Sequence, residues 1–244
     1  MLRTPALWAL ITLFAATIAC GDDDDNNNSS PGQSGGGLTL QGQVVDYPDP
    51  GEDREISLGT YFSETQENVT FGTGSLSASG EFTFTLEDND FSNGYQPVED
   101  FFDRICEATG PTLTLSDDDA GVLRRPTMGF ATEMLSGEFG LSAVSLSSSE
   151  DTAGRAQAEL FPRRHGDTLA IWVNADRDVT VQGTCIIAFE TTRNVESTID
   201  LSLNRGWNEI IVESITDSGT PAELSFETRE RPAELTWRFH KVGS

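Results

Sequence analysis

The sequence predicts an all-β protein, made of two sandwich-like antiparallel β modules with one short helix, after a signal peptide and a disordered linker. Apolar residues recur at every second position in many short stretches, as at Phe82, Phe84 and Leu86, which is typical of strands with one buried face. Clusters of Gly, Asp, Asn and Ser separate these stretches, as in sandwiches and barrels. Hydrophobic residues make up 36% of the 244 residues, which is enough to build a core.

The start of the chain has the layout of an export signal. Arg3 precedes an uncharged run from Pro5 to Ala19, which is shorter than the roughly 20 apolar residues of a membrane span. The run ends at Cys20, directly after the small residue Ala19. These residues resemble the lipobox of bacterial lipoprotein precursors, which implies that 1–19 are a signal peptide and that Cys20 is lipidated. The alternative is an ordinary cleaved signal peptide beside an unrelated cysteine.

Residues 20–37 join this end to the rest of the chain. The stretch GDDDDNNNSSPGQSGGG after Cys20 has no large apolar residue, so it cannot bury enough surface to offset the entropy of ordering. We therefore expect a disordered acidic and Gly/Ser-rich linker with an r.m.s. reach of roughly 23 Å. The run Asp22 to Asp25 could bind calcium, but a solvated spacer is the simpler interpretation.

The remaining chain is predicted to form an N-terminal β-sandwich-like module, 38–94, and a C-terminal β-sandwich module, 95–244. Gly206 marks one hairpin, because glycine readily adopts the positive φ that a three-residue loop with a bulge requires. The alternation and the turn residues place strands at 38–46, 56–62, 68–78, 81–87, 111–116, 126–134, 138–147, 168–174, 178–191, 196–204, 207–215, 221–228 and 233–240.

One segment follows a different period. Val98, Phe101, Phe102 and Ile105 recur at i, i+3, i+4 and i+7, which places them on one side of a helix. Two acidic residues occupy the first turn and a Gly-Pro pair follows, as at helix ends. The pattern predicts a short helix over 98–108.

Two strand-like stretches carry a resemblance to a known module. GQVVD at 42–46 matches an opening G-x-V strand, and SGEFTFTL at 79–86 matches a G-x-F-x-F-x-L strand. Residues 42–88 thereby resemble the carboxypeptidase-regulatory, transthyretin-like β-sandwich modules of secreted bacterial proteins. The resemblance implies a scaffold or an adhesive spacer, with no catalytic residues to carry over.

The cysteines predict a disulfide. If Cys20 is lipidated, only Cys106 and Cys185 remain, in a compartment that permits disulfides. Cys185 shares a strand face with apolar residues, and Cys106 lies beside the apolar stripe of the predicted helix. We favour a Cys106–Cys185 bridge over two unrelated buried thiols.

An acidic loop after the strand at 81–87 resembles part of a calcium-binding EF-hand. Oxygen donors stand at loop positions 1, 3, 5, 9 and 12, and the last of them can bind a cation bidentately. Position 6 is Asn93 instead of glycine, and a strand rather than a helix precedes the loop. An acidic turn whose final glutamate caps a helix is the favoured interpretation. The calcium alternative would use Asp88, Asp90, Ser92, Gln96 and Glu99.

Composition and motifs exclude several functions. With 15 Lys+Arg against 40 Asp+Glu the formal net charge is −25, which argues against nucleic acid as a partner. The sequence contains no G-x-S-x-G, and its two histidines, His165 and His240, are expected at the surface, so nucleophilic catalysis has no support. Two tryptophans, Trp172 and Trp207, are either core residues, the interpretation we favour, or part of an exposed platform for glycans.

The sequence as a whole predicts a lipid-anchored surface lipoprotein of the bacterial envelope with a non-enzymatic binding or structural role. It contacts the membrane through its N-terminal lipid, and a glycan or an envelope protein is the expected partner. No cofactor is expected. Two alternatives remain open: an extracellular carbohydrate-active hydrolase using paired carboxylates, and a calcium-stabilised adhesion module.

Overall fold

The computed structural model describes residues 37–45, 47, 53–62, 67–88, 91, 94–106, 109–123, 130–132, 141–155, 162, 166–189, 193–215 and 223–242. The predicted signal peptide, Cys20 and all but the last residue of the predicted linker lie outside this part of the chain. The strands of the first half are β1 (Leu38–Gln43), β2 (Arg54–Phe62), β3 (Glu67–Leu76), β4 (Glu81–Leu86), β5 (Tyr95–Pro97), β6 (Thr109–Leu115), β7 (Gly121–Leu123) and β8 (Phe130–Thr132). The second half adds β9 (Leu141–Ser147), β10 (Thr168–Ala175), β11 (Val179–Phe189), β12 (Arg193–Leu203), β13 (Gly206–Ile215), β14 (Glu223–Glu227) and β15 (Thr236–Val242). Two short helices complete the list, α1 (Val98–Ile105) and α2 (Glu150–Arg155).

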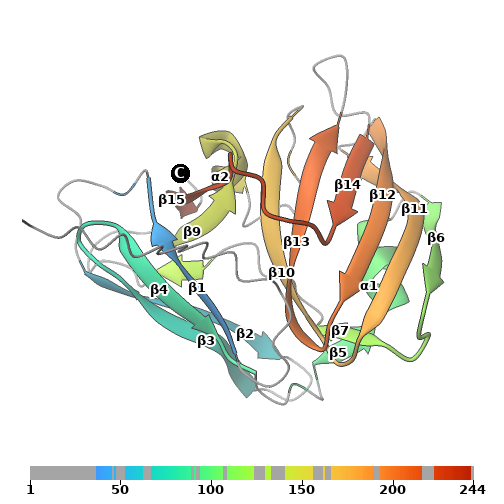
Figure 1. The fold of residues 1–244 in the computed structure, drawn as a ribbon, viewed down its shortest axis with the longest axis horizontal. Coiled ribbons are helices and arrows are strands. Elements are labelled where there is room, and N and C mark those ends of the chain that lie inside the picture. The colour runs from blue at the N-terminus through green and yellow to red at the C-terminus, as the bar shows by residue number, and fades with distance from the viewer. Residues whose placement is uncertain are drawn as a thin grey trace, which may run out of the picture.

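Hydrogen bonds connect twelve of these strands in one path, β1-β4-β3-β2-β8-β9-β10-β13-β14-β12-β11-β6, while β15 pairs with β9, and β5 and β7 join at β10. The path begins with the four strands nearest the N-terminus, which form one wing of the molecule, and ends in a broad curled sheet that forms the other (Figure 1). Nearly all pairings are antiparallel, and the parallel pair β12–β14 is an exception. The predicted all-β class is confirmed.

The curled sheet packs around the first core. Helix α1 lies against its inner face, and the four residues that gave the helical period, Val98, Phe101, Phe102 and Ile105, are all buried there. They meet alternate residues of β10 to β14, including Ile210 of β13. The expected helix therefore exists, and it ends three residues earlier than predicted, at Ile105.

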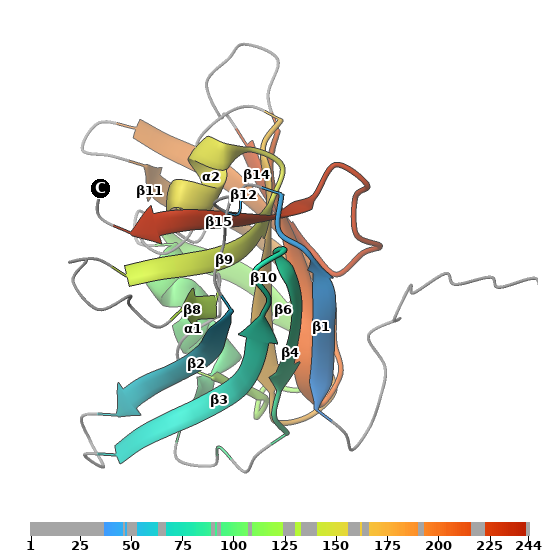
Figure 2. The same ribbon diagram turned by 90° about the vertical axis from the view of Figure 1, so that its left-hand side faces the viewer.

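A second core lies on the opposite face of β10 and β13. All eight residues of β10 are buried, because Leu169 and Ile171 face the first core while Ala170 and Trp172 face the second. β1, β4, β9 and β15 close this second core from the other side (Figures 1 and 2). The central pair β10–β13 thus serves as a wall shared by both cores.

Residues on both sides of the module boundary expected at residue 94 contribute to this second core. Val44, in the segment predicted as the N-terminal module, bridges Trp237 of β15, and Phe71 packs edge-on against Trp207 with ring centroids 6.0 Å apart. β2 also pairs with β8 through Ile56. Strands from both sides of residue 94 therefore share one sheet path and one core.

Three elements are additions to the expected set. β5 and β7 are three-residue strands that pair with each other, and α2 is a single helical segment after β9. Ser149 begins α2 by accepting a hydrogen bond from the backbone N–H of Thr152 at 3.2 Å. Each of these elements is too short for a periodic pattern to be visible in the sequence.

Candidate functional site

The outer face of the first four strands carries an ordered set of polar side chains. β1 to β4 alternate, so their apolar residues enter the second core and the residues between them face solvent. The strand register aligns the outward residues in two rows across the sheet. We call these eight residues the polar grid: its upper row is Glu55, Ser75, Thr83 and Gln41, and its lower row is Asp53, Ser77, Glu81 and Gln43.

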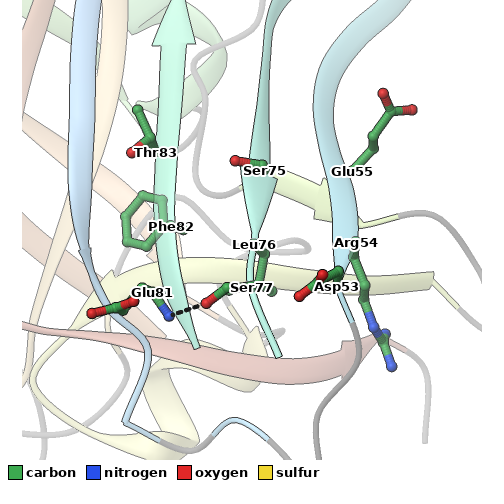
Figure 3. Close-up of a pocket in the computed structure, with 9 residues that line it drawn as sticks. All are labelled: Asp53, Arg54, Glu55, Ser75, Leu76, Ser77, Glu81, Phe82 and Thr83. Carbon is green, nitrogen blue, oxygen red and sulfur yellow. Dashed lines mark hydrogen bonds between the residues drawn. The ribbon is translucent and has the colours of Figure 1, made fainter. Parts of the chain in front are cut away.

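A hollow of about 480 Å³ lies over the grid between β2, β3 and β4. Figure 3 shows Glu55, Ser75 and Thr83 side by side across the three strands, with Asp53 and Ser77 below them. The backbones of Leu76 and Phe82 pass through the same region, while both of these side chains are buried in the second core. The hollow is therefore open to solvent. Hydroxyl and carboxylate groups line it, although carbon atoms make up more of its surface than polar atoms do.

Backbone hydrogen bonds brace the lower row. The Asp53 carboxylate accepts a hydrogen bond from the backbone N–H of Ala78 at 2.6 Å. Ser77 Oγ accepts one from the backbone N–H of Glu81 at 3.1 Å. The side-chain amide of Gln43 donates to the carbonyl of Ser79 at 2.7 Å, which ties β1 to the β3–β4 turn. These contacts fix the side chains of three of the four lower-row residues without satisfying all of their hydrogen-bonding capacity.

The upper row is open. Ser75 and Thr83 face each other across β3 and β4, and directly opposed cross-strand residues have Cβ atoms about 4.5–5.5 Å apart. Within the part of the chain that the structure describes, the side chains of Glu55, Ser75, Thr83 and Gln41 make no hydrogen bond to protein. All four side chains are exposed, so they can bond to water or to a ligand.

The charge at the hollow is negative. Asp53, Glu55 and Glu81 contribute carboxylates, and Arg54 is the basic residue among those lining it. The Arg54 guanidinium is directed to the inner side of the sheet, where it lies 5.3 Å from the ring centroid of Phe239 and 5.9 Å from that of Tyr47. The hollow can thus accept hydrogen bonds at several points and disfavours anions.

The predicted disulfide is confirmed. Cys106, just after α1, and Cys185 of β11 are bonded, with Cα atoms 5.6 Å apart. Both residues are buried in the first core, as their position beside apolar stripes predicted.

The structure describes only part of the proposed calcium loop. Asp90 and Ser92 lie outside the described residues. Gln96 belongs to β5 and is 5% exposed, and its side-chain oxygen accepts a hydrogen bond from Arg104. Glu99 and Asp88 are exposed. Gln96 is buried and its oxygen is next to the positive charge of Arg104, so this residue is poorly placed to bind a cation.

The described residues also bear on the proposed aromatic platform, on metal binding and on membrane-spanning helices. Trp172 and Trp207 are 0% and 9% exposed, which confirms them as core residues and removes the aromatic platform. No group of three or more His, Cys, Asp or Glu among the described residues is arranged to hold a metal ion. His165 is outside the described part. Where the structure is described, none of the helices has the length and apolar character that crossing a membrane demands.

A second charged cluster lies just after the C-terminal end of β10, and its role is structural. Arg177 lies between Asp176 and Asp117, at 3.2 Å and 3.5 Å. Its pKa is raised, chiefly by the hydrogen bond to Asp176 and by the nearby negative charge. Asp176 also accepts a hydrogen bond from the backbone N–H of Gly121 at 2.9 Å. The cluster fastens the loop before β7 to the end of β10.

Comparison of the chain with known family models, curated proteins and solved structures found no match.

The sequence analysis did not predict the polar grid. The alternation of threonines with phenylalanines in β4 was visible, but the sequence did not show which strands would lie beside it.

Proposed function

We propose that this chain is a lipid-anchored protein of the bacterial envelope whose β domain binds an envelope component without catalysing a reaction. The observation that carries the proposal is the open hollow on the outer face of β2, β3 and β4, which is lined by six residues that carry a hydroxyl or a carboxylate. A shallow site lined by braced polar groups suits recognition of a polar surface or chain. An enclosed, water-excluding site, in which electrostatic catalysis is most effective, would suit an enzyme better.

The location rests on separate observations. Cys20 follows the apolar run at the position that the lipobox resemblance assigns to the lipidated residue. A buried disulfide between Cys106 and Cys185 is typical of proteins that fold in an oxidising compartment such as the periplasm or the cell surface. The linker would let the domain move relative to the membrane while the lipid holds it there.

Replacement of Cys20 tests the anchor. A Cys20→Ala variant keeps the apolar export signal but has no thiol to acylate, so we expect it to be lost from the membrane fraction. Detergent phase partitioning of cells that express each form is the measurement. A variant that stays as firmly membrane-bound as the wild type would overturn the lipoprotein assignment.

Binding is tested with the full chain in detergent micelles. We expect the purified protein to co-sediment with cell-envelope fractions and to release no soluble product from them. Release of soluble sugar during the incubation would favour the carbohydrate-active hydrolase instead, with the carboxylates of Asp53, Glu55 and Glu81 as the first candidates. Failure to co-sediment with any envelope fraction would contradict the proposed binding function.

A further inference from the structure

We propose that the polar grid is a binding site for an uncharged glycan. This inference rests on the binding function proposed above and names the class of ligand. Three properties of the grid lead to it: the chemistry of its side chains, its charge, and the difference between its two rows.

The side chains of the grid match a polyhydroxyl ligand. Each hydroxyl of a sugar can donate one hydrogen bond and accept others, and it is best matched by groups that do the same. Ser75 and Thr83 supply hydroxyls and Gln41 supplies an amide, each of which both donates and accepts. Glu55, at the end of the same row, accepts only. The upper row therefore offers donors and acceptors side by side across the four strands.

Charge and exposure argue against two classes of ligand, anionic polymers and apolar chains. The three carboxylates, Asp53, Glu55 and Glu81, repel anionic polymers such as uronate-rich or phosphate-bearing glycans. An apolar peptide or acyl chain would need large exposed apolar side chains to pack against. The large hydrophobic residues exposed in the described part of the chain are Val45 and Ile215, and neither lines the hollow.

The two rows have different roles in this site. In the lower row, hydrogen bonds to the backbone hold the side chains of Asp53, Ser77 and Gln43, so these three lose little entropy when they bind a ligand. The upper row presents groups that carry no protein partner within the described residues. Rows lie about 6.5 Å apart, because outward residues are two positions apart along each strand. A chain of sugar rings lying across the strands would meet both rows.

The curled sheet provides a matched comparison. Its outer face carries Thr114, Gln182 and Asp200 in one aligned row, which repeats the hydroxyl, amide and carboxylate chemistry. There the Gln182 amide donates to the Asp200 carboxylate at 3.1 Å, so the two groups satisfy each other. We therefore expect the grid to bind the glycan and the row on the curled sheet to remain inert.

The test compares two double variants in the full chain, in detergent micelles. Ser75→Ala with Thr83→Val removes both open hydroxyls while leaving β-compatible side chains. Thr112→Val with Thr114→Val makes the same kind of change on the curled sheet. Binding is measured by calorimetry against neutral, uronate-containing and amino-sugar oligosaccharides, and by co-sedimentation with envelope fractions. Equal melting temperatures establish that each variant is folded.

The wild type and the curled-sheet variant are expected to bind a neutral oligosaccharide with the same affinity. The grid variant is expected to bind it about tenfold more weakly, since two neutral hydrogen bonds are lost. Preference for the uronate or amino-sugar ligand would contradict the assignment of an uncharged glycan. Equal affinity of the grid variant and the wild type for the neutral oligosaccharide would overturn the polar grid as its site. Envelope co-sedimentation that survives in the grid variant would overturn this site and leave the binding function intact. Failure of the wild type itself to co-sediment with envelope fractions would overturn the binding function.

Discussion

At the scale of single residues, Trp237 of the second core is packed on several sides. Its ring stacks on Trp172 with centroids 5.5 Å apart and planes 5° from parallel. Phe82 meets it edge-on at 4.7 Å, and the Arg231 guanidinium lies 6.0 Å from its centroid. Close packing on several sides leaves the ring little freedom to move.

This packing explains the glycine at position 42. A Cβ atom on Gly42 would lie 2.7 Å from Trp237 Cδ1 and 2.9 Å from Nε1, shorter than van der Waals contact. Because Trp237 is pinned, we expect Gly42→Ala to lower the free energy of unfolding by about 1–3 kcal/mol. Chemical denaturation monitored by tryptophan fluorescence measures the change.

Gly110→Ala is the control for this prediction. Nothing lies within 4 Å of a Cβ built on Gly110, which is exposed in β6. That variant should be neutral or slightly more stable, because alanine loses less backbone entropy on folding than glycine. Equal unfolding midpoints for Gly42→Ala and Gly110→Ala would show that β1 can shift away from Trp237.

At the scale of elements, the disulfide connects α1 to β11. The helix packs through four buried apolar residues, and its last turn leads directly into Cys106. The bridge closes a loop between cysteines 79 positions apart in the chain, which restricts the unfolded state. We expect a variant with Cys106→Ala and Cys185→Ala to lose about 2–4 kcal/mol of unfolding free energy.

Thiol titration checks the bridge directly. Both sulfurs lie in residues that are at most 4% exposed, so mild reductant should not open the bond in native protein. Unfolded, unreduced protein carrying Cys20→Ala should contain no free thiol, and should gain two after full reduction. Two free thiols before reduction would contradict the disulfide.

The elements also show how far the sequence alone could lead. Long alternating strands such as β11 and β12 and the helix stripe of α1 were predicted, because each repeats its period several times. β5, β7 and α2 were missed, since three to six residues hold no repeated period. The order of strands depends on long-range pairing, as between Ile56 and Thr132, which no local pattern encodes. The polar grid depends on that order, so the sequence could not predict it.

At the scale of the whole molecule, β10 and β13 hold the two wings together. Alternate residues of these strands enter opposite cores, which explains why β10 is apolar at nearly every position instead of alternating. The chain after β14 then crosses β13 before it enters β15. Along this crossing Arg231 forms a two-point ion pair with Glu209, with its Nε 2.9 Å from a carboxylate oxygen. The C-terminal strand is thereby brought against β9 and beside β1.

This arrangement predicts how the N-terminal strands behave in isolation. Residues 38–94 were expected from the sequence to form their own module, yet their apolar faces pack on Trp207 and Trp237 from the rest of the chain. A peptide of residues 38–94 would expose Ile56, Leu76 and Phe84, which are fully buried in the whole molecule. We expect it to be unfolded in water, because four strands without the opposite layer bury too little apolar surface to offset the entropy of ordering. Amide dispersion in a two-dimensional NMR spectrum is the measurement, and the matched control is the same spectrum of the full chain in detergent micelles. A well-dispersed spectrum with cooperative thermal unfolding of the peptide would instead establish 38–94 as an independent module.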